Sequence, residues 1–225
     1  MRSGWLTGIL TFAIGSSASG QALTSQASPG QVEIGVFRQF FHRSVRYESG
    51  ALQTPVWDRL SILARVPLGK TAVLAIDGLA WHRGATDSFP NRDYFDFTFG
   101  VGVSVTTWQR GPTSLALNVH YHEQSNLDQS ASRYSKRTQQ FLVAAVVSRS
   151  VRLKRQRADL WAAPALVVDR LFQYPQFYPS DRATSIHNLG AIIGGALLVR
   201  GRGSFFGQLT YANYLQGQAG VSLLL

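Results

Sequence analysis

Residues 94–106 alternate between two kinds of side chain, and this alternation restricts the possible folds more than any other feature of the sequence. Every second position is bulky and apolar, and most positions between them carry Asp, Thr, Gly or Ser. A period of two indicates a β-strand with two different faces. Because the apolar face is the bulky one, the sequence predicts that it meets lipid and that the small polar face meets a narrow interior.

The next apolar segment, residues 114–123, follows the same rule. Leu115, Leu117 and Val119 share one face, whereas Asn118 and His120 share the other. An amphipathic strand of about 9–11 residues is long enough to cross a bilayer when it is tilted. In lipid every backbone polar group must be paired, so such strands have to close into a barrel.

Ten strand-like segments follow one another along the chain, and the connections between them alternate in length. Turns such as 67–70, 109–113 and 200–203 are tight, whereas 42–55 and 82–93 are long. Short periplasmic turns and longer extracellular loops are typical of a membrane barrel. We therefore predict an all-β, antiparallel, up-and-down transmembrane β-barrel of about ten strands, with eight strands as an alternative. The expected strands are 31–41, 56–66, 71–81, 94–108, 114–123, 138–150, 158–171, 187–199, 204–214 and 218–225.

This register assigns individual side chains to the two faces of the barrel. The side chains expected to face lipid are Phe95, Phe97, Phe99, Val101, Val103, Leu115, Leu117 and Val119. The polar side chains expected in the lumen are Glu33, Arg59, Arg65, Asp77, Asp96, Asn118, His120 and Asp169. In a narrow barrel these charges should pair and fill the space, because an unpaired buried charge is costly.

Two expected strands, 138–150 and 158–171, are apolar on both faces, and Pro164 lies within the second. Proline removes a ladder donor and favours an edge or a bulge. A soluble lipocalin-like barrel or a sandwich therefore remains an alternative fold.

The first 22 residues have the pattern of a secretory signal. Arg2 precedes a short apolar run, 6–14, and small residues suited to cleavage follow. We therefore expect a signal peptide at 1–22 and a single barrel domain at 23–225. The chain has no Cys, which excludes disulfides, cysteine metal sites and cysteine nucleophiles.

The net charge of +10 is concentrated in the expected short turns. These turns contain only basic charges, which we expect to form a periplasmic rim that contacts anionic phospholipid head groups. A nucleic-acid partner is not expected, because no aromatic stacking platform accompanies the basic run 152–157. The rim residues are Lys70, Arg110, Arg152, Lys154, Arg155, Arg157, Arg200 and Arg202.

The stretch from 120 to 126 is the one cluster with catalytic potential. His120 and His122 share a strand face and Ser125 follows, so a Ser–His–acid arrangement is conceivable. The stretch resembles the His-x-Ser-Asn motif of PagL-like lipid A deacylases, although here three residues separate His122 from Ser125. That resemblance would imply a lipid-modifying outer-membrane enzyme. No third ligand accompanies the two His residues, and we expect neither a metal nor a cofactor.

Taken over its whole expected barrel, the chain resembles the small bacterial outer-membrane β-barrel proteins in architecture. The resemblance implies location in the bacterial outer membrane, folding by the barrel assembly machinery, and contact with lipopolysaccharide. A monomer is expected. The favoured function is a non-enzymatic barrel, structural or presenting surface loops, with a narrow, polar, mostly plugged lumen. A lipid-modifying enzyme and a narrow passive channel remain alternatives.

Overall fold

The computed structural model describes most of the chain from residue 31 onward. The described ranges are 31–42, 45–48, 52–53, 56–86, 89–126, 134–154, 156–175, 181–185, 188–199, 202–212 and 215–225. The expected signal peptide lies outside them. These ranges contain strands, turns and bends, and within them no helix is long and apolar enough to cross a membrane.

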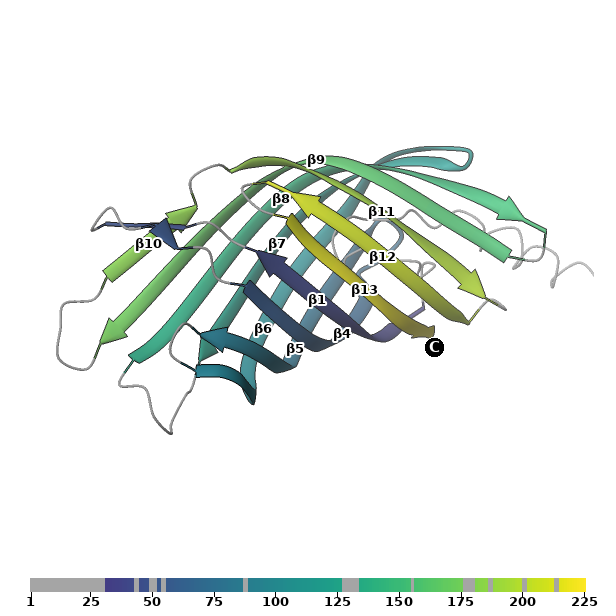
Figure 1. The fold of residues 1–225 in the computed structure, drawn as a ribbon. Helices are drawn as coiled ribbons and strands as arrows, with labels where there is room; N and C mark the ends of the chain where they lie inside the picture. The colour runs from purple at the N-terminus through teal and green to yellow at the C-terminus, as the bar shows by residue number, and fades with distance from the viewer. Residues whose placement is uncertain are drawn as a thin grey trace, which may run out of the picture.

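Ten antiparallel strands form a closed barrel (Figure 1). Each strand pairs with its neighbours in the chain, and β1 and β13 join the two ends of the sheet through a continuous ladder from Glu33–Leu224 to Phe41–Gln216. β9 pairs with β11 directly. The barrel strands are β1 (Glu33–His42), β4 (Val56–Pro67), β5 (Ala72–Thr86), β6 (Phe89–Arg110), β7 (Thr113–Asn126), β8 (Tyr134–Leu153), β9 (Gln156–Pro175), β11 (Leu189–Val199), β12 (Gly203–Tyr211) and β13 (Leu215–Leu224). The expected strand number and topology are confirmed.

Three short strands extend the sheet beyond the barrel strands at the loop end. They are β2 (Val45–Tyr47), β3 (Leu52–Gln53) and β10 (Asp181–Ser185). β10 pairs with the end of β9 at Arg170–Gln173, β2 pairs with β10, and β3 pairs with β2. This small extension belongs to connections that the sequence predicted as loops.

The strands reach further toward the loop end than the sequence predicted. Residues 82–86 and 89–93, expected to be loop, continue β5 and β6 as a paired ladder that ends near Thr86–Phe89. The expectation was wrong there because the period-two alternation that marks a strand stops in the sequence, whereas backbone pairing continues without it. β6 has 22 residues and β8 and β9 have 20 each, whereas β12 has nine and β13 has ten. The barrel wall is therefore tall on one side and low on the other (Figure 1).

The turns at the opposite end are tight. Gly69 and Gly111 have φ values of 114° and 57°, and Lys154 has a φ of 51°. Glycine adopts this left-handed region readily, which suits the two Gly-containing turns. These tight turns alternate with longer connections between β1 and β4, between β7 and β8 and between β9 and β11, as expected of an up-and-down barrel. The expected alternation fails at the β5–β6 connection, which has only two residues, and the β12–β13 connection has three.

Large apolar side chains cover the outer surface of the barrel. Phe99, Val103, Leu117 and Val119 of β6 and β7 are all exposed and lie at alternate positions. The same pattern continues around the wall. Further exposed members are Ile34, Val36, Leu60, Ile62, Ile76, Phe141, Val147, Leu160, Leu166, Ile193, Phe205, Leu209, Val221 and Leu223. A continuous exposed apolar belt of this extent is expected when the surrounding medium is lipid.

The interior is mainly polar along β5, β6, β7 and β13 but apolar along much of β8 and β9, whereas the sequence predicted a narrow, polar, mostly plugged lumen. Leu142 and Val146 of β8 and Val167 of β9 are fully or almost fully buried and belong to an apolar cluster within the barrel. The apolar inner faces of 138–150 and 158–171 therefore line a packed interior. Pro164 is exposed on the outside, and the β8–β9 register is the same on both sides of it.

We predict that Val119→Arg destabilises the barrel in lipid far more than Leu68→Arg. Both side chains are exposed, Val119 by 39% at mid-strand and Leu68 by 54% in a turn. An outward Arg costs about 2–4 kcal/mol at the bilayer midplane and about 0–1 kcal/mol near the interface. The measurement is the free energy of unfolding in lipid vesicles from urea titrations. In water both residues would tolerate Arg, so equal stabilities for the two variants would contradict the membrane placement.

Candidate functional site

The glycines of the alternating segment lie beneath two polar side chains from the flanking strands. Gly100 lies in register between Asp77 of β5 and His122 of β7, and Gly102 lies between Ala75 and His120. A methyl group on Gly100 would come 2.5 Å from Cγ of Asp77, and one on Gly102 would come 2.5 Å from Cδ2 of His120. The absence of side chains at Gly100 and Gly102 on the inner face of β6 therefore leaves room for the side chains of Asp77 and His120.

Asp77, His120 and His122 form a buried cluster next to these two glycines. Nε2 of His120 lies 3.2 Å from Oδ2 of Asp77, and Nε2 of His122 lies 3.2 Å from Oδ1. The two imidazole rings are stacked, with centroids 6.3 Å apart. Facing a carboxylate, Nε2 of His120 acts as an N–H donor to Oδ2, and His122 lies at ion-pair distance from Oδ1, so one acid contacts both rings.

The sequence predicted His120 and His122 as neighbours but did not identify their acidic partner. Asp77 lies 43 residues before His120, and only the β5–β6–β7 register brings it there. The period-two pattern places all three residues on inner faces, which is a real signal. The pattern does not predict which inward residues are in contact, because the register between neighbouring strands cannot be read from the sequence of one strand.

Polar contacts continue around the barrel from this cluster. Gln140 of β8 lies in register next to His122, and its Nε2 donates to Oδ1 of Asp169 on β9 over 3.0 Å. On the short-strand side, Nε1 of Trp161 donates to Oε1 of Gln208 over 3.2 Å. These four interior side chains thus bond to one another in pairs.

A second charged pair lies near the tight-turn end, on β1 and β4. Nη1 of Arg65 is 2.7 Å from Oε2 of Glu33, and both side chains have no solvent exposure. Ser222 donates a short hydrogen bond to Glu33, and the Arg65 guanidinium lies 5.6 Å from the ring centroid of Phe206. The acid neutralises the base and the aromatic face covers it, which makes burial of both charges tolerable.

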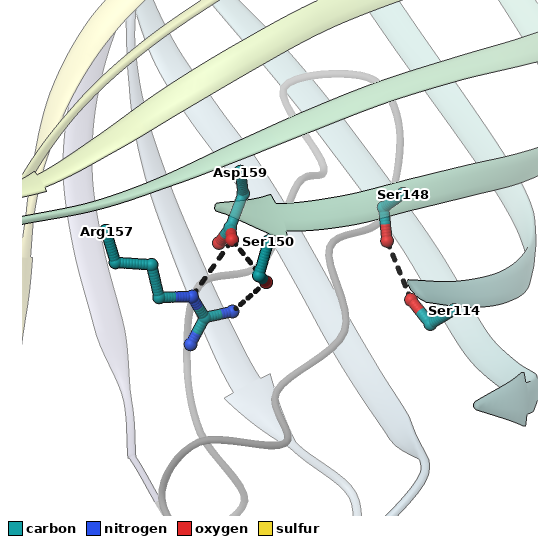
Figure 2. Close-up of polar contacts among 5 residues, drawn as sticks. All are labelled: Ser114, Ser148, Ser150, Arg157 and Asp159. Carbon is teal, nitrogen blue, oxygen red and sulfur yellow. Dashed lines mark hydrogen bonds and ion pairs between the residues drawn. The ribbon is translucent and has the colours of Figure 1, made fainter. Parts of the chain in front are cut away.

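A third polar group lies near the tight turn between β8 and β9 (Figure 2). Nε of Arg157 donates to Oδ1 of Asp159 over 2.9 Å, and Nη2 donates to Ser150 Oγ over 2.9 Å. Ser150 in turn donates to the same Asp159 oxygen over 2.6 Å. Nearby, the hydroxyls of Ser114 and Ser148 bond across β7 and β8. Arg157 was expected in the solvated rim, but its side chain is only 16% exposed, because its strand position directs it to Asp159.

The other predicted site residues divide into described and undescribed side chains. Glu33, Arg65, Asp77, Asn118, His120 and Asp169 are buried in the interior, whereas the side chains of Arg59 and Asp96 lie outside what the structure describes. Of the expected lipid-facing residues, Phe99, Val103, Leu117 and Val119 are exposed, Val101 and Leu115 are half-buried, and the side chains of Phe95 and Phe97 are not described. In the expected rim, Lys70, Arg110, Arg152, Lys154 and Arg202 are exposed, and Arg155 and Arg200 lie outside the described residues.

Ser125 shares a strand with His122, but strand geometry does not favour their pairing. The β7–β8 ladder continues without a register shift through Ser125–Arg137 to Asn126–Lys136. On a regular strand, residues three apart belong to opposite faces. The side chain of Ser125 itself is not among those described. Within the described ranges, no group of three or more His, Asp and Glu side chains has a geometry that could hold a metal ion.

The closed antiparallel sheet, its exposed apolar belt and its bonded interior define a transmembrane β-barrel. Neither a family model nor a curated protein sequence matches the chain. Among solved structures, the chain is similar to the outer membrane protease OmpT from Escherichia coli, at 9% identity and a TM-score of 0.46 over 90% of this chain and 99% of that one. It is also similar to outer membrane phospholipase A from Escherichia coli, at 11% identity and a TM-score of 0.28 over 96% of both chains. A porin of Rh. blastica gives 7% identity and a TM-score of 0.18 over 86% of this chain and all of that one.

We predict that Gly100→Ala destabilises the barrel, whereas Gly203→Ala is tolerated. The first methyl group would displace the Asp77 carboxylate from both His residues, at a cost of about 1–3 kcal/mol for overpacking. The second would have no neighbour closer than 3.9 Å. Unfolding in lipid vesicles measures both.

A double-mutant cycle separates the clash from a general effect of alanine in the strand. In an Asp77→Ala background, Gly100→Ala should cost less than about 0.5 kcal/mol, because the group that it strikes is gone. An undiminished cost in that background would show that Asp77 is not what the methyl group meets.

Proposed function

We propose that the protein is a bacterial outer-membrane β-barrel with a closed interior, and that its role is structural or surface-presenting. The observation that carries the proposal is complete burial at successive levels of the lumen. Glu33 and Arg65 near the tight turns, Leu63 and Asn118 at mid-strand, and Asp169 toward the loop end all have 0% exposure. Side chains lining an open water path would retain accessible surface, so a filled interior supports a barrel that does not conduct.

The enzymatic alternative finds less support in the geometry. A catalytic group must reach its substrate within hydrogen-bond distance. Asp77, His120 and His122 are each no more than 7% exposed. The Nε2 atoms of both His residues face the Asp77 carboxylate, and the backbone of Gly100 lies directly against that carboxylate. This arrangement suits three side chains that stabilise the wall rather than a nucleophile and base that face a bound lipid.

The strand lengths support a surface-presenting role. β6 has 22 residues and β8 and β9 have 20 each, whereas a tilted strand needs about 9–11 residues to cross a bilayer. β10, β2 and β3 add further paired backbone at the loop end. Structure of this kind outside the membrane does not help the chain to span it. We propose that this tall wall faces the cell exterior and carries whatever surface contacts the protein makes.

The proposed orientation places the exposed basic side chains on the periplasmic side. Lys70, Arg110, Arg152, Lys154 and Arg202 lie at the tight-turn end. A basic residue near an anionic membrane surface contributes about 1 kcal/mol of attraction. The same proposal includes contact of these side chains with phospholipid head groups, export by the segment 1–22 and assembly by the barrel machinery.

Single cysteines test the orientation, because the native chain has none. We expect a membrane-impermeant maleimide to label Arg46→Cys on β2 in intact cells and to leave Arg110→Cys in the β6–β7 turn unlabelled. Both residues are exposed, so both variants should react after lysis. Labelling of Arg110→Cys alone in intact cells would reverse the orientation, and recovery of the protein in the soluble periplasm would contradict membrane insertion.

Planar-bilayer recording tests the closed interior. We expect the inserted wild-type protein to give no steady single-channel conductance, because Glu33, Arg65 and Phe206 occlude one end of the lumen. Insertion is verified separately by a heat-modifiable band on unboiled gels. Stable ohmic steps from the verified wild-type barrel would favour the channel alternative instead.

A further inference from the structure

The outer wall carries two arginines in one row at the tight-turn end of β6, β7 and β8. Arg110, the last residue of β6, is the register partner of Thr113, the first residue of β7. Thr113 is in turn the register partner of Arg149 on β8. Both arginine side chains are exposed, and Thr113 between them is half-buried. We call these three residues the Arg110–Arg149 row.

A β-bulge brings Arg110 to the outer face. The β6–β7 register shifts between Thr106 and Trp108, so that Trp108 pairs with Leu115 on the outward side of β7. The hydroxyl of Thr107, the extra residue, donates to the carbonyl oxygen of Leu115 over 3.3 Å. A bulge redirects the side chains that follow it. Trp108 and Arg110 therefore lie outside, whereas unbroken alternation would direct both into the lumen.

Hydrogen bonds on the inner side hold the strands of the row together. The hydroxyls of Ser114 and Ser148 bond over 2.7 Å directly behind it (Figure 2). The N–H of Ser150 donates to the carbonyl oxygen of Pro112 in the β6–β7 turn over 2.8 Å. Register partners in an antiparallel ladder have Cα atoms about 4.5–5.5 Å apart, so the two arginines of the row start about 10 Å apart. Two arginine side chains extended toward each other can therefore reach one group over the strand between them.

The Arg110–Arg149 row marks the edge of the apolar belt. The next row toward mid-barrel contains Trp108 and Val147, which are 48% and 50% exposed. An outward cation beside hydrocarbon has to reach the interface, and exposed Trp is typical of that level in a barrel. The two guanidinium groups therefore lie where lipid head groups begin.

The charge of the row is not neutralised from within the protein. The four tight turns contain no acidic residue. Asp159, the register partner of Ser150, faces the interior and is bonded there by Arg157 and Ser150 (Figure 2). Among the residues that the structure describes, neither Arg110 nor Arg149 has an ion-pair partner. Two unneutralised cations in one row favour an anion from outside the chain.

We propose that the Arg110–Arg149 row binds the phosphate of one anionic phospholipid of the bilayer, with an acyl chain against Trp108 and Val147. Each arginine offers N–H donors in a planar fork that matches phosphate oxygens, and the Thr113 hydroxyl is a further donor between them. A head group without an ammonium is preferred, because the tight turns offer no acid to receive one. This inference rests on the proposed membrane location, and it gives the general contact between basic turns and head groups a particular site.

Native mass spectrometry of the full-length protein, released from detergent micelles, tests the proposal. The probes are phosphatidylglycerol, which is anionic, and phosphatidylcholine, which is zwitterionic, with matched acyl chains. We expect one phosphatidylglycerol to remain bound at concentrations at which phosphatidylcholine does not. Arg110→Gln and Arg149→Gln should each reduce that preference about tenfold, as loss of a charge-assisted hydrogen bond would. The double variant should bind the two lipids equally.

A matched control separates the row from the basic turns in general. Arg202→Gln removes an exposed arginine from the β11–β12 turn, at the same end of the barrel. It should bind phosphatidylglycerol as the wild type does. A loss in Arg202→Gln equal to that in Arg149→Gln would show a general attraction, and no loss in either row variant would likewise overturn the site.

Competition with a soluble head group tests the acyl-chain half of the proposal. Glycerol phosphate at the same concentration as phosphatidylglycerol should leave the lipid bound, because it has no chain to lie against Trp108 and Val147. Displacement of the lipid would overturn it in favour of a free phosphate compound. A spectrum dominated by dimers that Arg149→Gln abolishes would overturn it in favour of a second copy of the chain.

The same experiment separates this inference from the proposed function. The wild type and every variant are first examined for the heat-modifiable band of a folded, inserted barrel. An inserted barrel without lipid preference contradicts the Arg110–Arg149 site alone, whereas failure of the wild type to insert contradicts the membrane location itself.

Discussion

Pairing of the backbone around a closed ring is the constraint on which the rest of the structure depends. In hydrocarbon an unpaired N–H or C=O cannot turn to water, so a spanning sheet cannot keep a free edge. The ladder from Glu33–Leu224 to Phe41–Gln216 removes the edges that the first and last barrel strands would otherwise have. Once the ring is closed, every strand has one face toward the outside and one toward a shared interior. The sorting of side chains follows from that geometry.

The interior is organised by size as much as by charge. A barrel of ten strands encloses little more than its own side chains, so a large residue on one strand requires a small residue on the next. Asp77 and His120 rest over Gly100 and Gly102, and Trp161 rests over Gly194, where a methyl group would come 2.5 Å from Nε1 of the indole. The charges are arranged within this packing. Glu33 neutralises Arg65 and Arg157 binds Asp159, so the filled lumen does not contain isolated ions at these points.

The two sides of the wall differ, and the difference has consequences for function. The long strands β6, β8 and β9 have 20 to 22 residues, whereas the short strands β12, β13 and β1 have nine or ten and leave a low wall. A tilted strand needs only about 9–11 residues to cross a bilayer, so the long strands contain more paired backbone than crossing requires. The proposed surface-presenting role uses this excess length.

The sequence by itself determined the fold class, because alternation between lipid and interior is a local property that each strand displays alone. It determined the outward positions of Phe99, Leu117 and Val119 and the inward positions of Asp77 and His120. It failed at 82–86 and 89–93, where pairing continues without alternation, and at Arg157, whose turn-like context concealed its partner Asp159. Only the tertiary structure decided which inward residues meet, since contacts such as Asp77–His122 depend on the stagger between strands.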